Sequence, residues 1–458
     1  MGCPQNSLNS RHDQGPRVSQ ESVKLSKAVG GLRCAAVSDV GMRRANNQDS
    51  LAVAIAEEEA LWSSRGHLFV VADGMGAHAA GELASQIAAD CIPHTYHKRR
   101  DLAPCEALLA AVHDANARIN TKGQNSVDFH GMGTTCSCLA LLPGGAVAAH
   151  VGDSRVYRLR GDAFEQITFD HSLVWEMAVA GQANEEDVPA YVPKNVITRS
   201  LGPNGVVKVD LEGPFALQTG DRFLLCSDGL TGPLSSQLIG LIVGALPTDD
   251  ATQTLVDLAN LLGGPDNITV IVAEVYDTRE LGQHDASNPE CDPPPANSSA
   301  DQLPLLSALG VGLIGVVGCP LLWGVEHRVA AGALAVVTGL AAGLLMYARN
   351  KPSVTGASLP SPQGKAPYRR YETAPGPESI KPLVEIVRQL EDLEGQRDWQ
   401  FDWNEIHAER ESARNAIAKK DFRGAIVAYS RAVRILMQAV RDSTPEPPSD
   451  SSINLGVD

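Results

Sequence analysis

Short apolar runs alternate with polar, glycine-containing connections over residues 31–277, a pattern that predicts a dense mixture of strands and helices. Because several predicted strands follow one another without an intervening helix, we expect antiparallel sheets with helices packed outside them rather than a parallel doubly wound sheet. The predicted strands cover residues 32–38, 50–56, 67–72, 135–142, 146–151, 156–160, 221–226 and 268–275. The predicted helices cover residues 80–91, 105–122, 173–180, 235–244 and 249–262.

The pattern changes on both sides of this region. Polar residues at 1–30 predict a flexible leader, and proline-rich segments at 278–302 and 349–378 predict linkers. Between the linkers, residues 303–325 and 329–348 carry no charge, and each run is long enough for the roughly 30 Å hydrocarbon core of a bilayer. We therefore expect a transmembrane helical hairpin over 303–348, with a pair of buried core helices as the alternative. The lysines and arginines after the second run predict that both flanks, and hence the domain before them, face the cytoplasm.

Residues 379–441 show helical spacing and predict a small α-helical module. The stretch "IHAERESARNAIAKKDFRGAIVAYSRAVRILMQAV" resembles one tetratricopeptide unit, in which alanines lie at the close contacts of a helix–turn–helix. One unit is fewer than the roughly three that a stable array needs, so a coiled helical hairpin is the alternative. In either case we expect this module to bind a protein partner or to scaffold a complex. The acidic, proline-rich residues 442–458 predict a disordered tail.

The composition narrows the function classes. A length of 458 residues predicts two or three units, and a net charge of −16 argues against nucleic acid as a partner. The nine cysteines are scattered, and the alternating Cys136 and Cys138 have no matching second pair, which argues against a zinc site. We expect a chain with reduced, buried thiols in the cytosol.

Four aspartates stand at the ends of apolar runs. They are Asp49 in "NNQDSLAVAIA", Asp73 in "VVADGMGAHAAGE", Asp228 in "FLLCSDGLTG" and Asp266 in "GGPDNITVIVAEV". A single strand-end aspartate is typical of a turn. Four of them fit better with acids that converge on one point, where they would repel one another unless cations lay between them. The sequence therefore predicts a metal centre.

A set of motifs carries a family resemblance. The stretches "SDVGMRRANNQDS", "VVADGMGAHAAGE", "GMGTT", "HVGDSRVYRL", "TFDHSLV", "NVITRSLG", "LLCSDGLT" and "GGPDNITVIV" occur in this order. Together they resemble the metal-dependent Ser/Thr protein phosphatases, the PPM or protein phosphatase 2C family, in their bacterial form. The resemblance implies an α+β fold, a four-layer α-β-β-α sandwich of two antiparallel sheets flanked by helices. It also implies hydrolysis of phosphoserine and phosphothreonine in proteins by a water activated by two ions, Mn²⁺ or Mg²⁺.

The resemblance assigns the metal centre residue by residue. Asp73 would bridge both ions, and Gly74 would offer its main-chain carbonyl at a position where a side chain would obstruct the metal-bound waters. Asp228 and Asp266 would hold one ion, and Asp49 would support the pair. Oxygen ligands of this kind suit Mn²⁺ or Mg²⁺ and do not suit zinc.

The resemblance also implies groups that handle the substrate. Arg44 matches the arginine that grips the substrate phosphate, a task that suits its planar fork. His78 is the candidate for protonating the leaving oxygen, and the alternative is a loop histidine without a catalytic role. His150 and His171 are expected to be structural, and residues 174–195 would form the variable flap beside the site.

Two positions depart from the family pattern. Gln48 stands where the family usually has glutamate, so one negative charge is lost and metal affinity is expected to be weaker. Gly232 stands where bacterial members often have an aspartate that shares a third metal with Asp153. A third site at Asp153 would therefore be weak at best.

Two function classes remain open from the sequence. The first is an active phosphatase at the cytoplasmic face of a membrane, in contact with membrane lipid, acting on phosphorylated proteins and on Ser/Thr kinases. The second is a catalytically weak phosphatase-like scaffold or phosphoprotein-binding protein. The presence of all four strand-end aspartates and of Arg44 favours the enzyme.

Overall fold

The computed structural model describes residues 23–76, 79–179, 196–278, 364–391 and 403–443. The chain divides into two compact units, and every described residue belongs to the one formed by Met1–Gln283 and Leu359–Asp458. The expected disordered tail at 442–458 lies almost wholly outside the described residues, as do residues 1–22 of the expected leader at 1–30. Residues 23–29 of that leader form a strand, so this part of the prediction is wrong.

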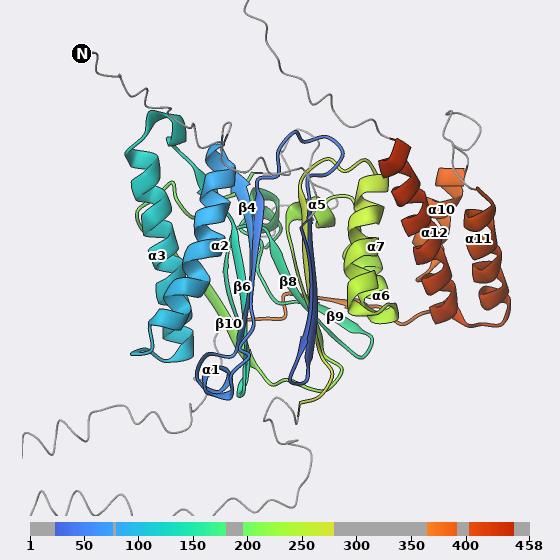
Figure 1. Ribbon diagram of the computed structural model, residues 1–458, viewed down its shortest axis with the longest axis horizontal. Helices are drawn as coiled ribbons and strands as arrows, with labels where there is room; N and C mark the ends of the chain where they lie inside the picture. Colours follow the sequence, from blue (N-terminus) through green and yellow to red (C-terminus); the bar gives the residue numbers. More distant parts are fainter. Residues whose placement is uncertain (1–22, 77–78, 180–195, 279–363, 392–402, 444–458) are drawn as a thin grey trace, which may run out of the picture. The chain divides into compact units, whose positions relative to one another are not determined.

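Two antiparallel sheets form the centre of this unit (Figure 1). The first sheet has seven strands in the order β1 (Val23–Val29), β2 (Leu32–Asp39), β12 (Ile268–Val275), β11 (Arg222–Cys226), β8 (Arg155–Arg160), β9 (Ala163–Gln166) and β13 (Arg369–Glu372). The second has the order β10 (Asp210–Phe215), β7 (Gly145–Val151), β6 (Cys136–Leu142), β4 (His67–Met75) and β3 (Asp49–Ala54), with β5 (Gly133–Thr134) paired to β4.

Helices cover the outer face of each sheet, so the expected four-layer arrangement is confirmed for this part of the chain. The long helices α2 (Ala80–Lys98) and α3 (Pro104–Gln124) pack on the second sheet, and α6 (Ser236–Ala245) and α7 (Thr248–Leu261) pack on the first. The short elements are α1 (Glu59–Arg65), the 3-10 turn Val127–Phe129, α4 (Leu173–Val179) and α5 (Asp228–Thr231). Between the sheets lies a separate apolar layer that includes Phe69, Leu139 and Phe223.

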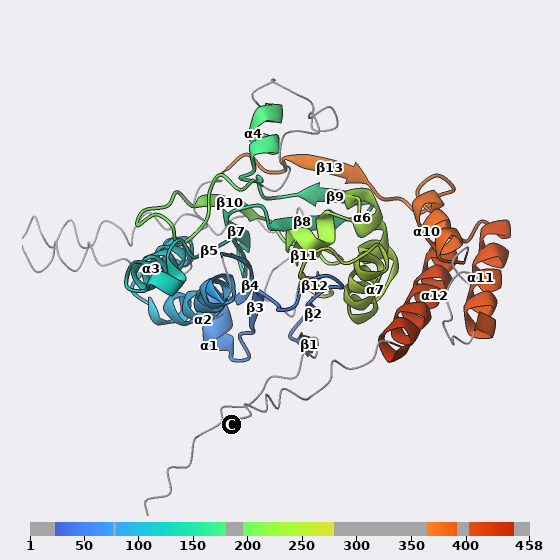
Figure 2. The ribbon, with the colours of Figure 1, turned by 90° about the horizontal axis from the view of Figure 1, so that it is seen from above.

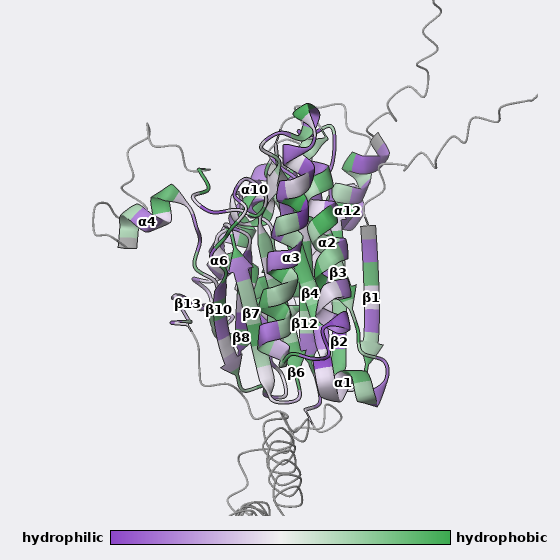
Figure 3. Ribbon diagram, turned by 90° about the vertical axis from the view of Figure 1, so that its left-hand side faces the viewer, coloured by the Kyte–Doolittle hydropathy of each residue, from purple (hydrophilic) through white to green (hydrophobic). Residues whose placement is uncertain are grey.

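Local chemistry explains where several of these elements begin and how they pack. Every residue of β6 and β7 is buried, as their nearly continuous apolar runs require of strands covered on both faces. Figure 3 colours most of β4 and β6 as hydrophobic, whereas the edge strand β1 alternates. On α2, Ala80, Ala84 and Ala88 face the sheet, and their small side chains let the helix approach it closely. The Ser235 hydroxyl caps α6 by accepting a hydrogen bond from the Leu238 amide at 3.3 Å.

The C-terminal region packs back onto the first sheet. Within the expected linker at 349–378, Arg369–Glu372 forms β13, which pairs with β9. The helices α10 (Lys381–Glu391), α11 (Trp403–Ala418) and α12 (Phe422–Ser443) match the expected helical region. Leu383 of α10 and Ile426 of α12 enter the same apolar cluster as Ile239 of α6 and Leu255 of α7. The helical region and the sandwich therefore share one core.

The membrane anchor needs a correction. No helix in the part of the chain that the structure describes is both long and apolar enough to cross a bilayer, so the prediction of a membrane-anchored chain with two transmembrane helices is wrong. The two uncharged runs, 303–325 and 329–348, themselves lie outside the described residues. This prediction and the expected contact with membrane lipid both rest on these two uncharged runs.

An ion pair near the end of α12 gives a first test of the shared core. Arg441 lies 2.7 Å from the carboxylate of Asp257 on α7, whose side chain is 2% exposed. Burial raises the pKa of Asp257, and the Arg441 charge opposes that rise. We expect Arg441→Ala to lower the free energy of unfolding by about 2–3 kcal/mol at neutral pH, because it leaves a buried carboxylate with Gln253 as its neighbouring donor.

The loss of unfolding free energy in Arg441→Ala should depend on pH. A carboxyl group whose pKa is higher in the folded state stabilises the fold at low pH and loses that contribution as the pH rises through the raised value. The gap between Arg441→Ala and the parent should therefore narrow as the pH falls, as measured by urea unfolding at several pH values. Arg431→Ala is the control, since its pair with Glu409 is long, at 3.9 Å, and exposed. An equal loss in both variants would contradict a specific role for Arg441.

Candidate metal centre

The four strand-end aspartates meet where the two sheets end. Asp49 and Asp73 face each other directly on the neighbouring strands β3 and β4 of the second sheet. Asp228 follows β11, and Asp266 lies just before β12, which is paired to β11 in the first sheet. Each sheet therefore contributes two carboxylates to one end of the sandwich. Asp153, in the turn after β7, joins them as a charged neighbour of Asp73 and Asp228.

Burial and mutual repulsion both raise the pKa values of Asp49, Asp73 and Asp153. Burial, followed by the charges of Asp49 and Asp228, raises the pKa of Asp73 well above its ordinary value. Burial raises the pKa of Asp49 to about 7, although the hydroxyl of Ser227 donates to its Oδ2 at 2.7 Å. Burial, followed by the charge of Asp228, raises the pKa of Asp153 to about 8. A positive charge among these groups would relieve both effects.

Three carboxylate oxygens of this cluster are shielded from solvent and have no hydrogen-bond partner among the described residues. They are the Oδ1 atoms of Asp49, Asp153 and Asp228. Such atoms are costly unless a donor or a cation satisfies them. In the described part of the chain, no three His, Cys, Asp or Glu side chains form a ready ligand set on their own. Small divalent ions nevertheless keep several waters and need only one or two carboxylates each, so these residues fit a hydrated Mg²⁺ or Mn²⁺.

Arg44 is a cation that directly contacts one of the aspartates of this centre. Its Nη2 lies 2.7 Å from Oδ2 of Asp266, and its side chain is 51% exposed. The hydrogen bond with Asp266, and then the charges of Asp266, Asp73 and Asp228, raise its pKa. The guanidinium therefore sits at the mouth of the acidic cluster, open to solvent on one side.

The loop that carries Arg44 is held by a residue that the sequence analysis did not single out. The amide group of Asn267 accepts from the Gln48 backbone at 2.8 Å and donates to the carbonyls of Val40 and Asn46, each at 2.9 Å. Its neighbour Asp266 is the partner of Arg44. The signal for this role was present in "GGPDNIT", since an asparagine in a turn commonly binds nearby backbone groups.

Gly74 is required by backbone packing. A Cβ atom there would overlap the carbonyl oxygens of Gly81, in the first turn of α2, and of Gln48. The Gly74 amide also donates to the Gln48 carbonyl at 3.1 Å. Room for metal-bound waters was the reason expected for this glycine, and the backbone contacts add another: strand, helix and loop backbones meet here without space for a side chain.

Some of the remaining predicted site residues border the acidic cluster, and others lie outside the described residues. Asp153 is close to the centre, and Gly232 ends α5 with its amide 2.7 Å from the Asp228 carbonyl, so both expected third-site positions border the cluster. His78 lies outside the described residues. Of the expected flap at 174–195, only its start in α4, up to Val179, is described.

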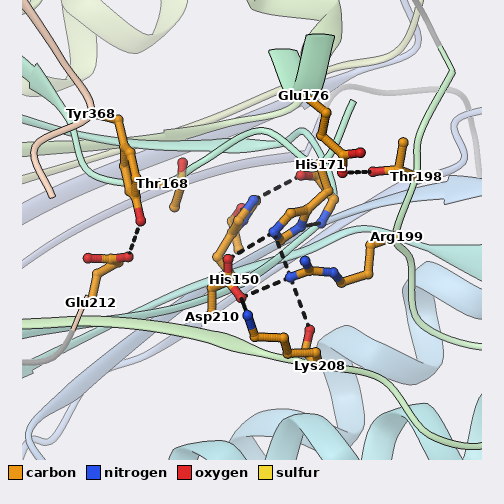
Figure 4. A network of polar contacts seen from close by, with 12 residues as sticks. His150, Thr168, His171, Glu176, Thr198, Arg199, Lys208, Asp210, Glu212 and Tyr368 are labelled. Atoms are coloured by element: carbon orange, nitrogen blue, oxygen red, sulfur yellow. Dashed lines mark hydrogen bonds and ion pairs between the residues drawn. The ribbon is translucent and has the colours of Figure 1, made fainter. Parts of the chain in front are cut away.

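His150 and His171 belong to a buried network beside the centre (Figure 4). The Gly152 amide donates to Nδ1 of His171 at 2.9 Å, and Nε2 of His171 lies 3.0 Å from Asp210. The His150 ring stacks on the His171 ring at 4.9 Å, and burial lowers the pKa of His150 to about 3. The network fixes the turn that carries Asp153, so both histidines act on the structure of the site.

The packing at Gly74 can be tested directly. We expect Gly74→Ala to lower the free energy of unfolding by about 1–3 kcal/mol or more, because backbone atoms on two sides would have to move. Gly205→Ala is the control, since a Cβ there meets only Asn120 Oδ1, at an ordinary 3.6 Å. Denaturant unfolding measures both variants. Equal stability of the two would show that the close approach at Gly74 is relaxed in solution.

Comparison with known proteins finds a matching family profile and similar chains. The family profile of protein phosphatase 2C matches residues 42–262. The chain is 37% identical over 248 residues to the protein phosphatase PhpP of Streptococcus pneumoniae, covering 52% of this chain and 96% of that protein. It is 34% identical over 249 residues to the serine/threonine protein phosphatase PstP of Mycobacterium tuberculosis, covering 54% of this chain and 45% of that protein.

A solved structure also aligns with the sandwich. The crystal structure of the catalytic domain of PstP in complex with two manganese ions is 35% identical and covers 54% of this chain and 99% of that chain, with a TM-score of 0.46.

Proposed function

This chain belongs to the protein phosphatase 2C family of Ser/Thr protein phosphatases, and we propose that it uses two divalent cations, Mn²⁺ or Mg²⁺, to hydrolyse phosphoserine and phosphothreonine in proteins. The observation that carries the metal proposal is the set of unsatisfied, shielded carboxylate oxygens at the end of the sandwich. Ordinary turn aspartates would have donors at these atoms. Acids from both sheets instead face one another, an arrangement that suits a shared pair of ions.

The carboxylates have distinct positions in this proposal. Asp49 lies opposite Asp73, and Asp228 is within hydrogen-bonding reach of it, which supports the proposal that Asp73 would help to hold both ions. Gly74 would contribute its main-chain carbonyl, and Asp266 would share an ion with Asp228. Asp153, with Gly232 as its neighbour, would support no more than a weak third site. When bound, the ions would supply Lewis-acid polarisation of the phosphate ester and a water that ionises near neutral pH.

Arg44 would orient the substrate. A guanidinium can hold two oxygens of a phosphate at once, and this one is exposed at the mouth of the cluster. Binding a phosphate would replace its present contact with Asp266 and leave that carboxylate free for an ion. His78 remains our candidate for giving a proton to the leaving oxygen. The substrates would be phosphorylated proteins, and Ser/Thr kinases are candidates among them.

Replacement of Asp73 tests the metal proposal. We expect Asp73→Asn to abolish hydrolysis of a phosphothreonine peptide and to remove the rise in melting temperature that Mn²⁺ gives the parent, since an ion that binds only the folded state stabilises it. Without divalent ions, the variant should be at least as stable as the parent, because one of several mutually repelling charges is gone. Activity assays and thermal unfolding with and without Mn²⁺ check this. Near-parental turnover by the folded variant would contradict the two-ion proposal, whereas weak activity in the parent would favour the scaffold alternative.

Gln48 allows a gain-of-affinity test. Its side-chain nitrogen lies near Gly81 in the first turn of α2, where the helix dipole favours a negative charge. We expect Gln48→Glu to lower the Mn²⁺ concentration for half-maximal activity and the Kd for Mn²⁺ in calorimetry by about 2- to 10-fold, since a carboxylate returns beside Asp73. Gln124→Glu on the exposed end of α3 is the control for added charge. Overlapping titrations of the two variants would show that Gln48 has no part in metal binding.

A further inference from the structure

A short C-terminal segment runs along the open side of the sandwich. We call residues 366–373 the strap. Its strand β13 pairs with β9 from Arg369 opposite Gln166 to Glu372 opposite Ala163. The hydroxyl of Thr373 donates to the Asp162 carbonyl at 2.9 Å, and the Tyr368 amide donates to the Gln166 carbonyl, also at 2.9 Å. The strap is thus an integral edge of the first sheet.

The same segment is also fixed to the second sheet. The phenol of Tyr368 donates to Oε1 of Glu212 at 2.6 Å, and the Ala366 amide donates to Oε2 of the same residue at 3.0 Å (Figure 4). Glu212 lies on β10 and is only 2% exposed. Both oxygens of a buried carboxylate are therefore satisfied by the strap, so the strap has a defined position relative to both sheets.

From this position the strap contacts α4. The guanidinium of Arg369 lies 3.7 Å from the ring centre of Trp175, a buried residue of α4. The ring of Tyr368 packs edge-on against Phe169, which packs in the same manner against Trp175, each at 5.4 Å. Figure 2 shows α4 and β13 on the same side of the sandwich. Because a helix of seven residues is not stable by itself, its position depends on contacts of this kind.

The contacts of α4 continue to the carboxylate centre. Arg155 lies over the Trp175 ring at 5.8 Å and pairs with Asp170 at 2.6 Å. Arg155 follows Asp153 by two positions and is the first residue of β8. The amide of His171, just before α4, donates to the Gly152 carbonyl at 2.7 Å. The start of α4 is therefore bound to the turn that carries Asp153, and α4 borders the centre.

We propose that Arg369 is a positioning residue, which holds α4 through Trp175 and so shapes the rim of the carboxylate centre that a phosphorylated protein segment must contact. The proposal rests on the proposed phosphatase activity. A small phosphate ester reaches the centre without touching the rim, whereas an extended peptide lies across it. The strap therefore affects recognition of peptides and leaves the hydrolytic step unchanged. The chain's own C-terminal region is in this way a part of its substrate-binding surface.

The test uses Arg369→Ala in the full chain, assayed with Mn²⁺. We expect KM for a phosphothreonine peptide to rise about fivefold, the scale of a cation–π contact that is partly open to water. The kcat for the peptide, and kcat/KM for p-nitrophenyl phosphate, should change less than about twofold. Hydrogen exchange of the amides in 173–179 should become faster, a change that does not depend on activity. Arg369→Lys keeps a cation over the ring and should restore most of the parental KM.

Two further variants test whether the effect on KM is specific to the contact between Arg369 and Trp175. Arg370→Ala removes the next arginine of the strap, whose side chain is 65% exposed and whose nearest acidic partner is Glu165 at 3.7 Å, and it should leave the peptide KM unchanged. Trp175→Leu should raise the peptide KM at least as much as Arg369→Ala, since it also removes the contacts of Trp175 with Arg155 and Phe169. Adding Arg369→Ala to Trp175→Leu should cause no further rise, because the contact of Arg369 with the ring is already gone.

The outcomes separate this proposal from the proposed function. An unchanged peptide KM with unchanged exchange in 173–179, or an equal loss of kcat/KM on peptide and ester, would overturn the role of Arg369. Additive effects of Arg369→Ala and Trp175→Leu would also overturn it. Failure of the parent to hydrolyse either substrate would instead contradict the phosphatase activity itself.

Discussion

The repulsion among buried carboxylates is the constraint on which the rest of the site depends. Five aspartates from strands and turns of both sheets are held at one end of the sandwich, and burial disfavours the charge of most of them. Left to themselves, such groups would move apart or bind protons. They stay together because each is attached to a rigid strand end. In the proposed function, cations bound among these groups would relieve their repulsion.

The supporting residues can be understood from the same constraint. Gly74 lets three backbone segments meet, so that Asp73 is held between Gln48 and α2 without freedom to retreat. Asn267 fixes the loop from Val40 to Gln48, and that loop presents Arg44. The histidine network performs the corresponding task for the turn of Asp153. Each of these groups holds backbone in place, and none has to bind a ligand in order to matter.

The C-terminal region contacts both walls of this centre. At one side the strap touches α4, and at the other Arg441 of α12 lies 3.8 Å from Asp39, at the root of the loop that carries Arg44. Asp39 in turn accepts from the Gly41 amide at 2.9 Å and from Asn260 at 3.0 Å. The helical region is therefore attached at two points that border the site, in addition to the core that it shares with α6 and α7.

The strand-end acids could be predicted because an aspartate at the end of an apolar run is a local signal, whereas the four-layer sandwich was implied by the family resemblance. The strand β13 could not be predicted in this way, since "RRYE" has four residues and no apolar alternation, and pairing with β9 makes it a strand. The C-terminal helices were predicted from their spacing. An amphipathic pattern shows that one face is buried but does not show what covers it. Likewise, Gly74 was recognised as important, and only the structure could add the backbone contacts as a further reason.

The position of β13 in the chain has a consequence for the order in which the protein forms during synthesis. Thr373 and its partner Asp162 are 211 positions apart, so β9 leaves the ribosome long before the strand that covers its edge. At roughly 5–20 residues per second, the delay is about 10–40 s. From the time that β11 and β12 have followed until β13 is made, the first sheet presents an open edge at β9, and such an edge readily pairs with a neighbouring chain. Nascent chains of this protein should therefore depend on chaperones for longer than those of relatives in which the sheet is completed within the catalytic segment.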